Sequence, residues 1–403
     1  MSQFRKSRPF NSGRPVRNYQ NRGGSQNRRQ PKKAYIHPSK FVQSASPQTE
    51  QVYVPEHSFK DFELVEIIKT NLESMSYQHP SPIQDQAIPH GLEGKDIVGI
   101  ANTGTGKTAA FAIPVLNRLI TERASKAIIL APTRELAEQI EQQCRVIGRG
   151  SGLDGVLLIG GVPMGPQLRD LKNNPRIIIG TPGRIKDHLT RGSLKIKDCN
   201  IAVLDEVDRM LDMGFVHDIT HILSNTSTDR QGYYFSATLD ARVREVINKF
   251  SKNVTHITVK SGDTSSNVEQ NIVMHNAQNK LDKLHDILIH DSTSKTIIFD
   301  DTHRLVEKLS KELAVRGFKT EAIHGGKSQS QRKNALKKFK NNEVTVLVAT
   351  DVAARGLDVS DVSHVINYSL PQSYDDYVHR IGRTGRAGKI GNALTFIDEK
   401  VER

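Results

Sequence analysis

The sequence has few cysteines and no long apolar run. Cys144 and Cys199 are the only cysteines among 403 residues, too few for a disulfide framework or a structural zinc site, which is typical of a reducing compartment. No apolar stretch approaches the roughly 20 residues needed to span a bilayer, and the polar start of the chain lacks the apolar core of a signal peptide. We therefore expect a cytoplasmic protein without a membrane partner.

Acidic residues are missing from positions 1–49, which carry eleven Lys or Arg. The whole chain has a net charge of +13, so the remainder carries only +2. Residues 1–57 also have few aliphatic side chains and no periodicity, so they bury too little surface to offset the entropy lost on ordering. We expect a disordered basic tail over 1–57, which either binds nucleic acid through its charge and interleaved aromatic rings or only keeps the chain soluble.

Short apolar runs alternate with helical patterns in two successive stretches of the chain. The expected strands are 97–100, 127–130, 155–159, 177–179, 201–204 and 232–235 in the first stretch, and 271–274, 296–299, 321–323, 344–348, 365–368 and 393–397 in the second. Such alternation predicts parallel, doubly wound sheets of the α/β class. The polar segment 260–270 is interpreted as a linker, so we expect α/β domains over 58–259 and 271–403.

A turn of small residues, Ala101–Thr108, follows the first expected strand. Its backbone N–H groups can close around phosphate oxygens while Lys107 reaches the β and γ phosphates and the Thr108 hydroxyl ligates Mg²⁺. A Gly-Lys-Thr sequence alone is a weak signal, because it is also found in loops and helix caps, and the strict pattern has glycine in place of Ala101.

An acidic quartet, Asp205-Glu206-Val207-Asp208, follows the fifth expected strand. Asp205 can bind a metal ion, and Glu206 can orient or deprotonate water. Such a quartet is by itself usually a solvated turn. Because it occurs together with the Lys107 turn, and both follow strands of one α/β pattern, the pair predicts an NTP hydrolase.

With these motifs in place, the chain resembles the DEAD-box RNA helicases from Phe59 to its C-terminus, in the family's motif order. The resemblance implies two tandem RecA-like domains, ATP and Mg²⁺ as cofactors, RNA as partner, and RNA-stimulated hydrolysis of ATP. Phe59 and the segment Tyr77–Gln84 resemble the adenine-sensing Q motif, which implies ATP rather than GTP because the Gln84 amide pairs with the adenine edge. The implied ATP-binding residues are Phe59, Tyr77, Gln84, Ala101, Asn102, Thr103, Gly104, Thr105, Gly106, Lys107, Thr108 and Asp358.

Further segments resemble the family's RNA contacts. Glycine permits close backbone approach, and Thr and Arg offer donors to phosphate; outside this context the same segments would be a capped helix start and a turn. The implied RNA-binding residues are Pro132, Thr133, Arg134, Gly161, Thr181, Gly183 and Arg184 in the first domain, and Gln329, Arg332, Thr350 and Gly356 in the second. Contacts of this kind imply recognition of RNA that is largely independent of base sequence, with ribonucleoprotein complexes as further partners.

The run His379–Arg386 is similar to the family's arginine-finger motif. The resemblance implies that Arg383 and Arg386 point at the γ-phosphate and that His379 bridges to Asp208. The Ser236-Ala237-Thr238 segment is implied to couple hydrolysis to strand separation. The implied metal ligands are Thr108 and Asp205. The implied catalytic residues are Lys107, Glu206, Ser236, Thr238, His379, Arg383 and Arg386.

The chain departs from the common family pattern at a few positions. Val207 stands in place of Ala, Asn102 in place of Gln, Ser76 in place of Gly, and Ser81 in place of Thr. We expect these changes to preserve activity, and we expect no long helix after the last strand. Two other functions remain open at this point, namely an ATP-gated RNA clamp or scaffold with little unwinding, and a DNA translocase that shares the same motor.

Overall fold

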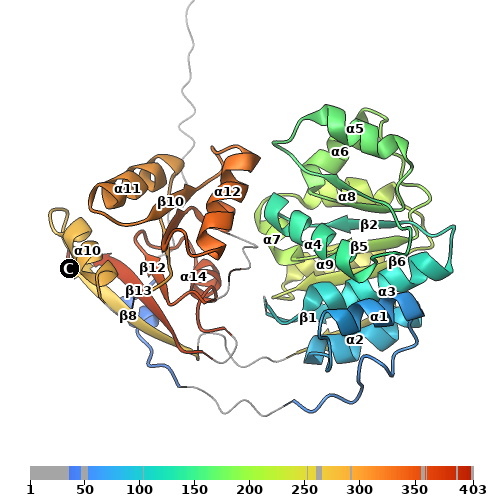
Figure 1. Cartoon of the computed structure of the whole chain (residues 1–403), viewed down its shortest axis with the longest axis horizontal. Coiled ribbons are helices and arrows are strands. Elements are labelled where there is room, and N and C mark those ends of the chain that lie inside the picture. Colours follow the sequence, from blue (N-terminus) through green and yellow to red (C-terminus); the bar gives the residue numbers. More distant parts are fainter. Residues whose placement is uncertain are drawn as a thin grey trace, which may run out of the picture. The chain divides into compact units, whose positions relative to one another are not determined.

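The computed structural model describes most of the chain as two parallel-sheet α/β domains (Figure 1). The described residues are 36–46, 53–102, 104–251, 253–259, 266–290, 293–354, 359, 361–386 and 389–400. Strands β1–β7 form the sheet of the first domain and β8–β13 that of the second. The predicted fold class is confirmed. No helix in these ranges has the length and apolar character required to cross a membrane.

The sheet of the first domain has the strand order β3-β4-β2-β5-β6-β1-β7, and every neighbouring pair is parallel. Its strands are Asp96–Ile100 (β1), Ala127–Leu130 (β2), Gly155–Leu158 (β3), Ile177–Gly180 (β4), Ile201–Leu204 (β5), Gln231–Ser236 (β6) and Val254–Thr258 (β7). The sequence did not predict β7, because this edge strand pairs only with β1 and is largely exposed, so it lacks the apolar run of a buried strand.

Helices cover both faces of this sheet. The helices are Glu66–Ser74 (α1), Pro82–Leu92 (α2), Lys107–Thr121 (α3), Arg134–Ile147 (α4), Met164–Lys172 (α5), Pro182–Thr190 (α6), Val207–Asp212 (α7), Val216–Ser224 (α8) and Ala241–Phe250 (α9). Apolar side chains of α1–α4 form one core cluster with the sheet, and those of α6–α9 form the other. Close packing explains Gly99 in β1, since a Cβ there would lie 2.4 Å from the ring of Phe235.

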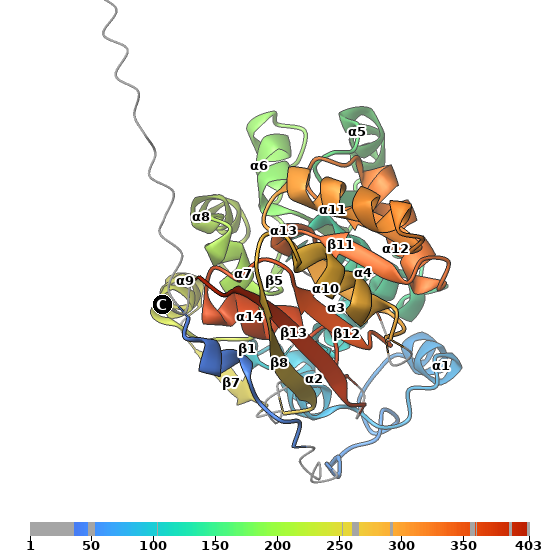
Figure 2. The same ribbon diagram turned by 90° about the vertical axis from the view of Figure 1, so that its left-hand side faces the viewer.

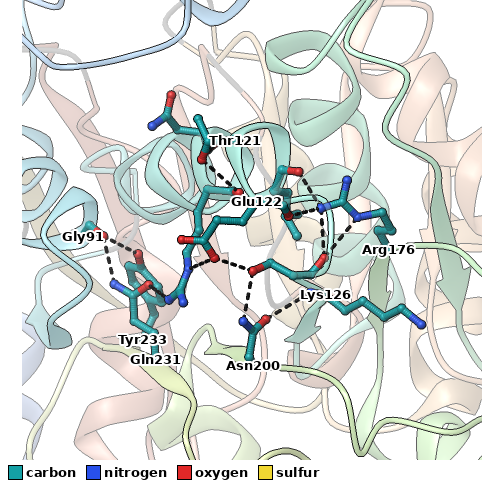
Figure 3. Close-up of polar contacts among 12 residues, drawn as sticks. Gly91, Thr121, Glu122, Lys126, Arg176, Asn200, Gln231 and Tyr233 are labelled. Carbon is teal, nitrogen blue, oxygen red and sulfur yellow. Dashed lines mark hydrogen bonds and ion pairs between the residues drawn. The ribbon is translucent and has the colours of Figure 1, made fainter.

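A polar network closes the C-terminal end of α3 (Figure 3). Arg176 donates to the carbonyl oxygen of Glu122 at 2.6 Å, and Arg118 donates to Gln231 Oε1 at 3.1 Å. Gln231 donates in turn to the Gly91 carbonyl oxygen at 2.9 Å. Because the last carbonyl groups of a helix have no partner within it, Arg176 satisfies the end of α3 opposite Lys107, while Arg118 and Gln231 link α3 to β6 and to the end of α2. We interpret the network as structural.

The sheet of the second domain has the order β10-β11-β9-β12-β13-β8, again all parallel. Its strands are Val268–His275 (β8), Thr296–Phe299 (β9), Thr320–Ile323 (β10), Val346–Ala349 (β11), His364–Asn367 (β12) and Gly391–Asp398 (β13), and its helices are Lys280–Leu288 (α10), His303–Val315 (α11), Gln329–Lys340 (α12), Asp351–Ala354 (α13) and Tyr374–Ile381 (α14). Since β8 begins at Val268, the last three residues of the expected linker 260–270 belong to the sheet.

The structure also differs from the predicted disordered tail over 1–57. Residues 1–35 and 47–52 lie outside the described residues, but the short 3₁₀ helix η1 (Pro38–Phe41) packs beside β8 and α14 (Figure 2), and Tyr53–His57 contacts α2. The prediction of disorder was wrong for these two pieces. The prediction rested on whether the segment could form a hydrophobic core of its own. One buried ring and a few polar groups are sufficient to order a short segment where an existing sheet or helix supplies their partners.

Candidate functional site

The motifs predicted for the first domain lie at one edge of its sheet. Because its strands are parallel, the turns that follow them leave the sheet on the same side. Lys107 follows β1, Asp205 and Glu206 follow β5, and Ser236 ends β6. In the sheet, β6 lies between β5 and β1. The topology therefore makes neighbours of turns that are far apart in the sequence.

The turn between β1 and α3 has the backbone geometry of a phosphate-binding loop. Gly104 and Gly106 have φ angles of 86° and 92°, values that glycine adopts readily and other residues do not. The buried Lys107 donates from Nζ to the Ala101 carbonyl oxygen at 2.8 Å. The lysine is thus held inside the loop, where phosphate oxygens could replace that carbonyl.

Neighbouring side chains brace the same loop. Thr105 Oγ1 donates to the Asn102 carbonyl oxygen at 2.8 Å, and Ser81 Oγ donates to the Thr105 carbonyl oxygen at 2.7 Å. Thr108 lies in the first turn of α3, the position from which its hydroxyl is predicted to ligate Mg²⁺. Thr103 lies outside the described residues. Ser81, a departure from the family's usual threonine, therefore keeps a hydroxyl in contact with the loop.

Gln84, predicted to recognise adenine, contacts both the loop and its own helix. Its Oε1 accepts from the Ser81 backbone N–H at 2.9 Å, and its Nε2 donates to the Gly106 carbonyl oxygen at 3.1 Å. A Cβ at Gly106 would lie 2.4 Å from that nitrogen. The contact therefore links the start of α2 to the phosphate-binding loop, and it requires glycine at position 106.

The two predicted adenine-binding aromatics pack against each other. Phe59 is only 4% exposed and lies in the core of the first domain, with its ring 5.2 Å from that of Tyr77 in an edge-on arrangement. The Tyr77 hydroxyl accepts from Gln143 Nε2 at 3.2 Å. Phe59 thus supports Tyr77 from beneath, and the partly exposed Tyr77 is the ring nearer the surface.

Two carboxylates are buried where β5 ends. Glu206 has a left-handed φ of 53°, a strained conformation for a residue other than glycine, of the kind found at functional sites. Burial raises the pKa of Asp205 to about 7, while the nearby Lys107 acts to lower it and Glu206 adds to the rise.

These oxygen ligands suit Mg²⁺. Among the described residues, no group of three or more His, Cys, Asp or Glu side chains could hold a metal ion by itself. Mg²⁺ needs no such group, because it binds one or two protein ligands, keeps several waters and takes phosphate oxygens of the substrate. The buried carboxylate of Asp205 and the hydroxyl of Thr108 match that ligand set.

Asp208 connects the acidic quartet to the Ser236-Ala237-Thr238 segment. Its Oδ2 accepts from the Thr238 backbone N–H at 2.9 Å, from Thr238 Oγ1 at 3.1 Å and from the Ala237 N–H at 3.1 Å. The Asp208 N–H donates to Ser236 Oγ at 3.3 Å. The Ser236-Ala237-Thr238 segment is thus attached to the acidic quartet by several hydrogen bonds.

The predicted RNA-binding residues of the first domain gather around the turn after β3. A Cβ on Gly161 would lie 2.0 Å from Arg134 Nη1, so any other residue would displace this guanidinium group, and the φ of 73° also favours glycine. Arg184 donates from Nη1 to the Val162 carbonyl oxygen at 3.2 Å. Pro132 and Thr133 precede α4, Thr133 accepting from the Leu136 N–H at 3.2 Å, and Thr181 and Gly183 lie at the start of α6. Two arginines and an exposed glycine therefore share one polar surface.

In the second domain, Gln329 and Arg332 face carboxylates of α4. Arg332 Nη2 lies 2.8 Å from Glu135 Oε2, and Gln329 Nε2 donates to Glu135 at 3.4 Å and to Glu138 at 3.3 Å. Both side chains are buried, and burial lowers the pKa of Arg332. In this structure the two predicted RNA-binding residues are therefore engaged by protein carboxylates.

The arginines of the His379–Arg386 run have different surroundings. Arg380 and Arg383 are both buried, and Arg380 Nε and Nη2 contact the two carboxylate oxygens of Asp351 at 2.6 and 2.7 Å. Arg383 and Arg386 donate from Nε to carbonyl oxygens within the run, at 3.3 and 2.9 Å. The structure thus assigns Arg380 a structural role, a distinction that the sequence pattern did not make.

The remaining predictions for the second domain have mixed outcomes. Among the described residues there is no hydrogen bond between His379 and Asp208, so the expected bridge does not form in this structure. Thr350 follows β11 and is buried. Gly356 and Asp358 lie outside the described residues.

Sequence reasoning missed the carboxylate of Asp85, which follows Gln84 directly and is 3% exposed. It accepts hydrogen bonds from Tyr53 and His57, as described below. An acidic residue directly after a predicted ligand, in the first turn of a helix, was the available signal.

Comparison with known proteins supports the assignment of the motifs. Residues 81–247 match the DEAD/DEAH box helicase family model, and residues 279–388 match that of the helicase conserved C-terminal domain. DEAD-box ATP-dependent RNA helicase CshA of Bacillus licheniformis is 45% identical over 84% of this chain and 70% of its own length. CshA of Bacillus subtilis is also 45% identical, over 84% of this chain and 69% of its own length.

Solved structures show the same fold. S. cerevisiae Dbp5 bound to RNA and ADP BeF3 has a TM-score of 0.75 and 31% identity, over 85% of this chain and 90% of that one. Mss116p bound to ssRNA and AMP-PNP has a TM-score of 0.75 and 32% identity, over 83% of this chain and 73% of that one. The motifs, the two sheets and these relatives together show that the chain belongs to the DEAD-box ATP-dependent RNA helicases.

Proposed function

We propose that this protein hydrolyses ATP in response to RNA and uses the energy to separate short RNA duplexes or to remodel ribonucleoprotein complexes in the cytoplasm. The observation that supports this most directly is the proximity of Lys107 to Asp205 and Glu206 at the ends of β1 and β5, the two strands that flank β6. This combination joins a lysine for phosphates to carboxylates for metal and water.

In this proposal the first domain binds and activates ATP. Gln84 exchanges its contact with the loop for the adenine edge, as expected of a Q motif, and Lys107 contacts the β and γ phosphates. Thr108 and Asp205 hold Mg²⁺, which when bound offsets the negative charge of the phosphates. Glu206 orients the attacking water and accepts its proton.

The second domain completes the site with Arg383 and Arg386. A guanidinium group that reaches the γ-phosphate stabilises the charge that develops during its transfer. The bonds between Asp208 and Thr238 support a coupling role, because a change around the γ-phosphate reaches the Ser236–Thr238 segment through one buried carboxylate. ATP and RNA bind more tightly when the two domains together complete the site, so their binding shifts the domains toward that arrangement. Loss of the γ-phosphate reverses the shift.

RNA binds, in the same proposal, over the surface that carries Arg134, Gly161 and Arg184. Contacts from guanidinium groups and backbone reach phosphate and sugar rather than base edges, so recognition depends little on base sequence and strongly on salt. The 2′-hydroxyl favours RNA over DNA. To bind RNA, Gln329 and Arg332 must release the carboxylates of α4 that they contact in this structure.

Steady-state ATP turnover, titrated with single-stranded RNA and with DNA of the same sequence, tests the proposal. We expect RNA to stimulate turnover and DNA to stimulate it much less. Turnover that ignores RNA would contradict the proposal, and equal stimulation by both would favour a DNA translocase. A duplex-displacement assay then separates a helicase from an ATP-gated clamp, which would hydrolyse ATP without releasing strands.

A further inference from the structure

The segment 36–46 is part of the second domain, although it precedes the first domain in the sequence. Phe41, at the end of η1, is 1% exposed, and its ring lies 4.8 Å from that of Tyr377 in α14. It shares a core cluster with Val268 of β8 and with Ile381. Burial of a large aromatic side chain stabilises the folded arrangement, which gives this short piece a specific position.

The same segment forms backbone hydrogen bonds along the edge strand β8. Gln43 N–H donates to the Gln270 carbonyl oxygen at 3.0 Å, and the Gln270 N–H donates back at 2.8 Å, in an antiparallel bridge. Ala45 N–H donates to a carboxylate oxygen of Glu269 at 2.7 Å. An exposed strand edge offers unpaired N–H and C=O groups, and these contacts use part of that edge.

The next described piece, 53–57, is anchored on the first domain by Asp85. The Tyr53 hydroxyl donates to Asp85 Oδ2 at 2.5 Å, the Glu56 N–H donates to the same oxygen at 2.8 Å, and His57 Nδ1 lies 2.7 Å from Oδ1. Burial acts to raise the pKa of Asp85, but the hydrogen bonds from Tyr53 and His57 outweigh it and the pKa is lowered. Several donors on one buried carboxylate make this anchor specific.

Only residues 47–52 separate the two anchors. Seven Cα–Cα steps from Ser46 to Tyr53 span at most about 25 Å, whatever conformation they take. The linker has the same reach, because residues 260–265 likewise leave seven steps between Val259 and Ser266.

The two connections also start from one place on the second domain. The Ser46 N–H donates to the Ser266 carbonyl oxygen at 3.0 Å, so the residues at which both connections leave this domain are hydrogen-bonded to each other. On the first domain, the linker leaves from β7, and the Asp85 anchor lies on α2, which packs against β7.

We propose that residues 36–57 form an intramolecular strap, a second short connection between the two domains that runs beside the linker. The linker alone already limits how far apart the domains can move, but it leaves them free to rotate about a single connection. A second connection with neighbouring ends removes many of these relative orientations, so less conformational entropy is lost when both domains engage ATP and RNA together. The consequence for turnover rests on the proposed function, whereas the limit on the relative orientation of the domains does not.

Cutting the strap tests the proposal without removing either anchor. A short protease recognition sequence replaces residues 47–52, and fluorescent dyes are attached at Glu245→Cys on α9 and Lys311→Cys on α11, both exposed, while the native Cys144 and Cys199 are buried. Energy transfer between the dyes, measured without nucleotide or RNA, reports the distance distribution of the domains. We expect cleavage to broaden this distribution toward longer distances, and an unchanged distribution would overturn the strap.

Turnover of the same samples gives the functional consequence. We expect the RNA concentration for half-maximal ATP turnover to rise about 3- to 10-fold on cleavage, with the maximal rate nearly unchanged, because the effective concentration of one domain near the other falls. If cleavage lengthens the distances but the protein shows no RNA-stimulated turnover, the result supports the strap and contradicts the proposed function. Longer distances with no change in the RNA requirement would overturn the strap's proposed effect on turnover.

Two further sets of variants sharpen the result. Insertion of about ten and about twenty Gly/Ser residues between the anchors is expected to raise the RNA requirement in steps, because tether length sets effective concentration. Asp85→Ala detaches the anchor on the first domain, and Asp61→Ala is its matched control, because the hydrogen bond that this exposed carboxylate accepts within the described part of the chain is a local one, from Ser58. Equal effects of the two substitutions would contradict the role of Asp85 as an anchor.

Discussion

In the first domain, the charged groups of the candidate ATP site contact one another or their own loops, whereas in the second domain the arginines of one motif divide into two kinds. Lys107 contacts the Ala101 carbonyl oxygen, and Asp208 contacts Thr238. In the second domain, Arg380 is locked on Asp351, while Arg383 is attached through Nε to a backbone carbonyl oxygen of its own run. The comparison supports the proposal that the first domain is preassembled for ATP and that the second contributes groups that complete the site on engagement.

Arg383 provides the largest expected effect. We expect Arg383→Ala to lower the maximal rate of RNA-stimulated turnover by about 10³- to 10⁵-fold, as for arginine fingers of comparable hydrolases, and to lower the stability of the second domain less than Arg380→Ala does. Arg380→Ala is its matched partner and should destabilise that domain by about 3 kcal/mol, because it leaves Asp351 without its buried partner. Denaturant unfolding and ATP turnover are measured on both variants. The comparison would be wrong if Arg383→Ala mainly lowered stability and Arg380→Ala mainly lowered turnover.

Glu206→Gln is the corresponding test of the first domain. We expect the maximal rate to fall by about 10²- to 10⁴-fold, the contribution of a positioned general base, while ATP-dependent RNA binding persists. The amide has nearly the shape of the carboxylate, so the loop geometry is retained. Fluorescence anisotropy with labelled RNA and a non-hydrolysable nucleotide measures the binding. Loss of binding together with turnover would show that Glu206 is needed to assemble the site.

Asp208→Asn tests the connection between hydrolysis and RNA. An uncharged amide at this position accepts the Thr238 hydrogen bonds more weakly, because bonds to a charged acceptor are about twice as strong as those to a neutral one. We expect duplex displacement per ATP hydrolysed to fall by about 3- to 10-fold, more than turnover itself falls. Equal losses in displacement and turnover would remove Asp208 from the coupling path.

Removal of residues 1–35 has the smallest expected effect. These residues carry ten Lys or Arg and no acid, so their deletion should weaken RNA binding and flatten its dependence on salt while the maximal rate of turnover remains. The deletion leaves the proposed strap, 36–57, in place. RNA affinity measured over a range of salt concentrations checks the prediction, and an unchanged slope would favour a tail that only keeps the chain soluble.

Much of the fold could be predicted from local patterns. Buried parallel strands read as continuous apolar runs, and for that reason 127–130, 201–204 and 296–299 were predicted with the bounds that the structure gives. The edge strand β7 was missed because Thr255 and His256 are polar and its outer side has no neighbouring strand. The pieces 36–46 and 53–57 were missed for a similar reason, since their partners are supplied by distant parts of the chain.

The sequence by itself determined the chemistry, because Lys107, Asp205 and Glu206 follow strands whose order along the chain identifies them. Only the tertiary structure decided how individual polar groups are used. Arg380 and Arg383 belong to the same motif but have different partners, because Asp351 lies against Arg380. Asp85 is an anchor because Tyr53 and His57 reach it. Local sequence sets conformational preference and chemical type, but the partner of a buried charge is chosen by contacts between residues that are distant in the sequence.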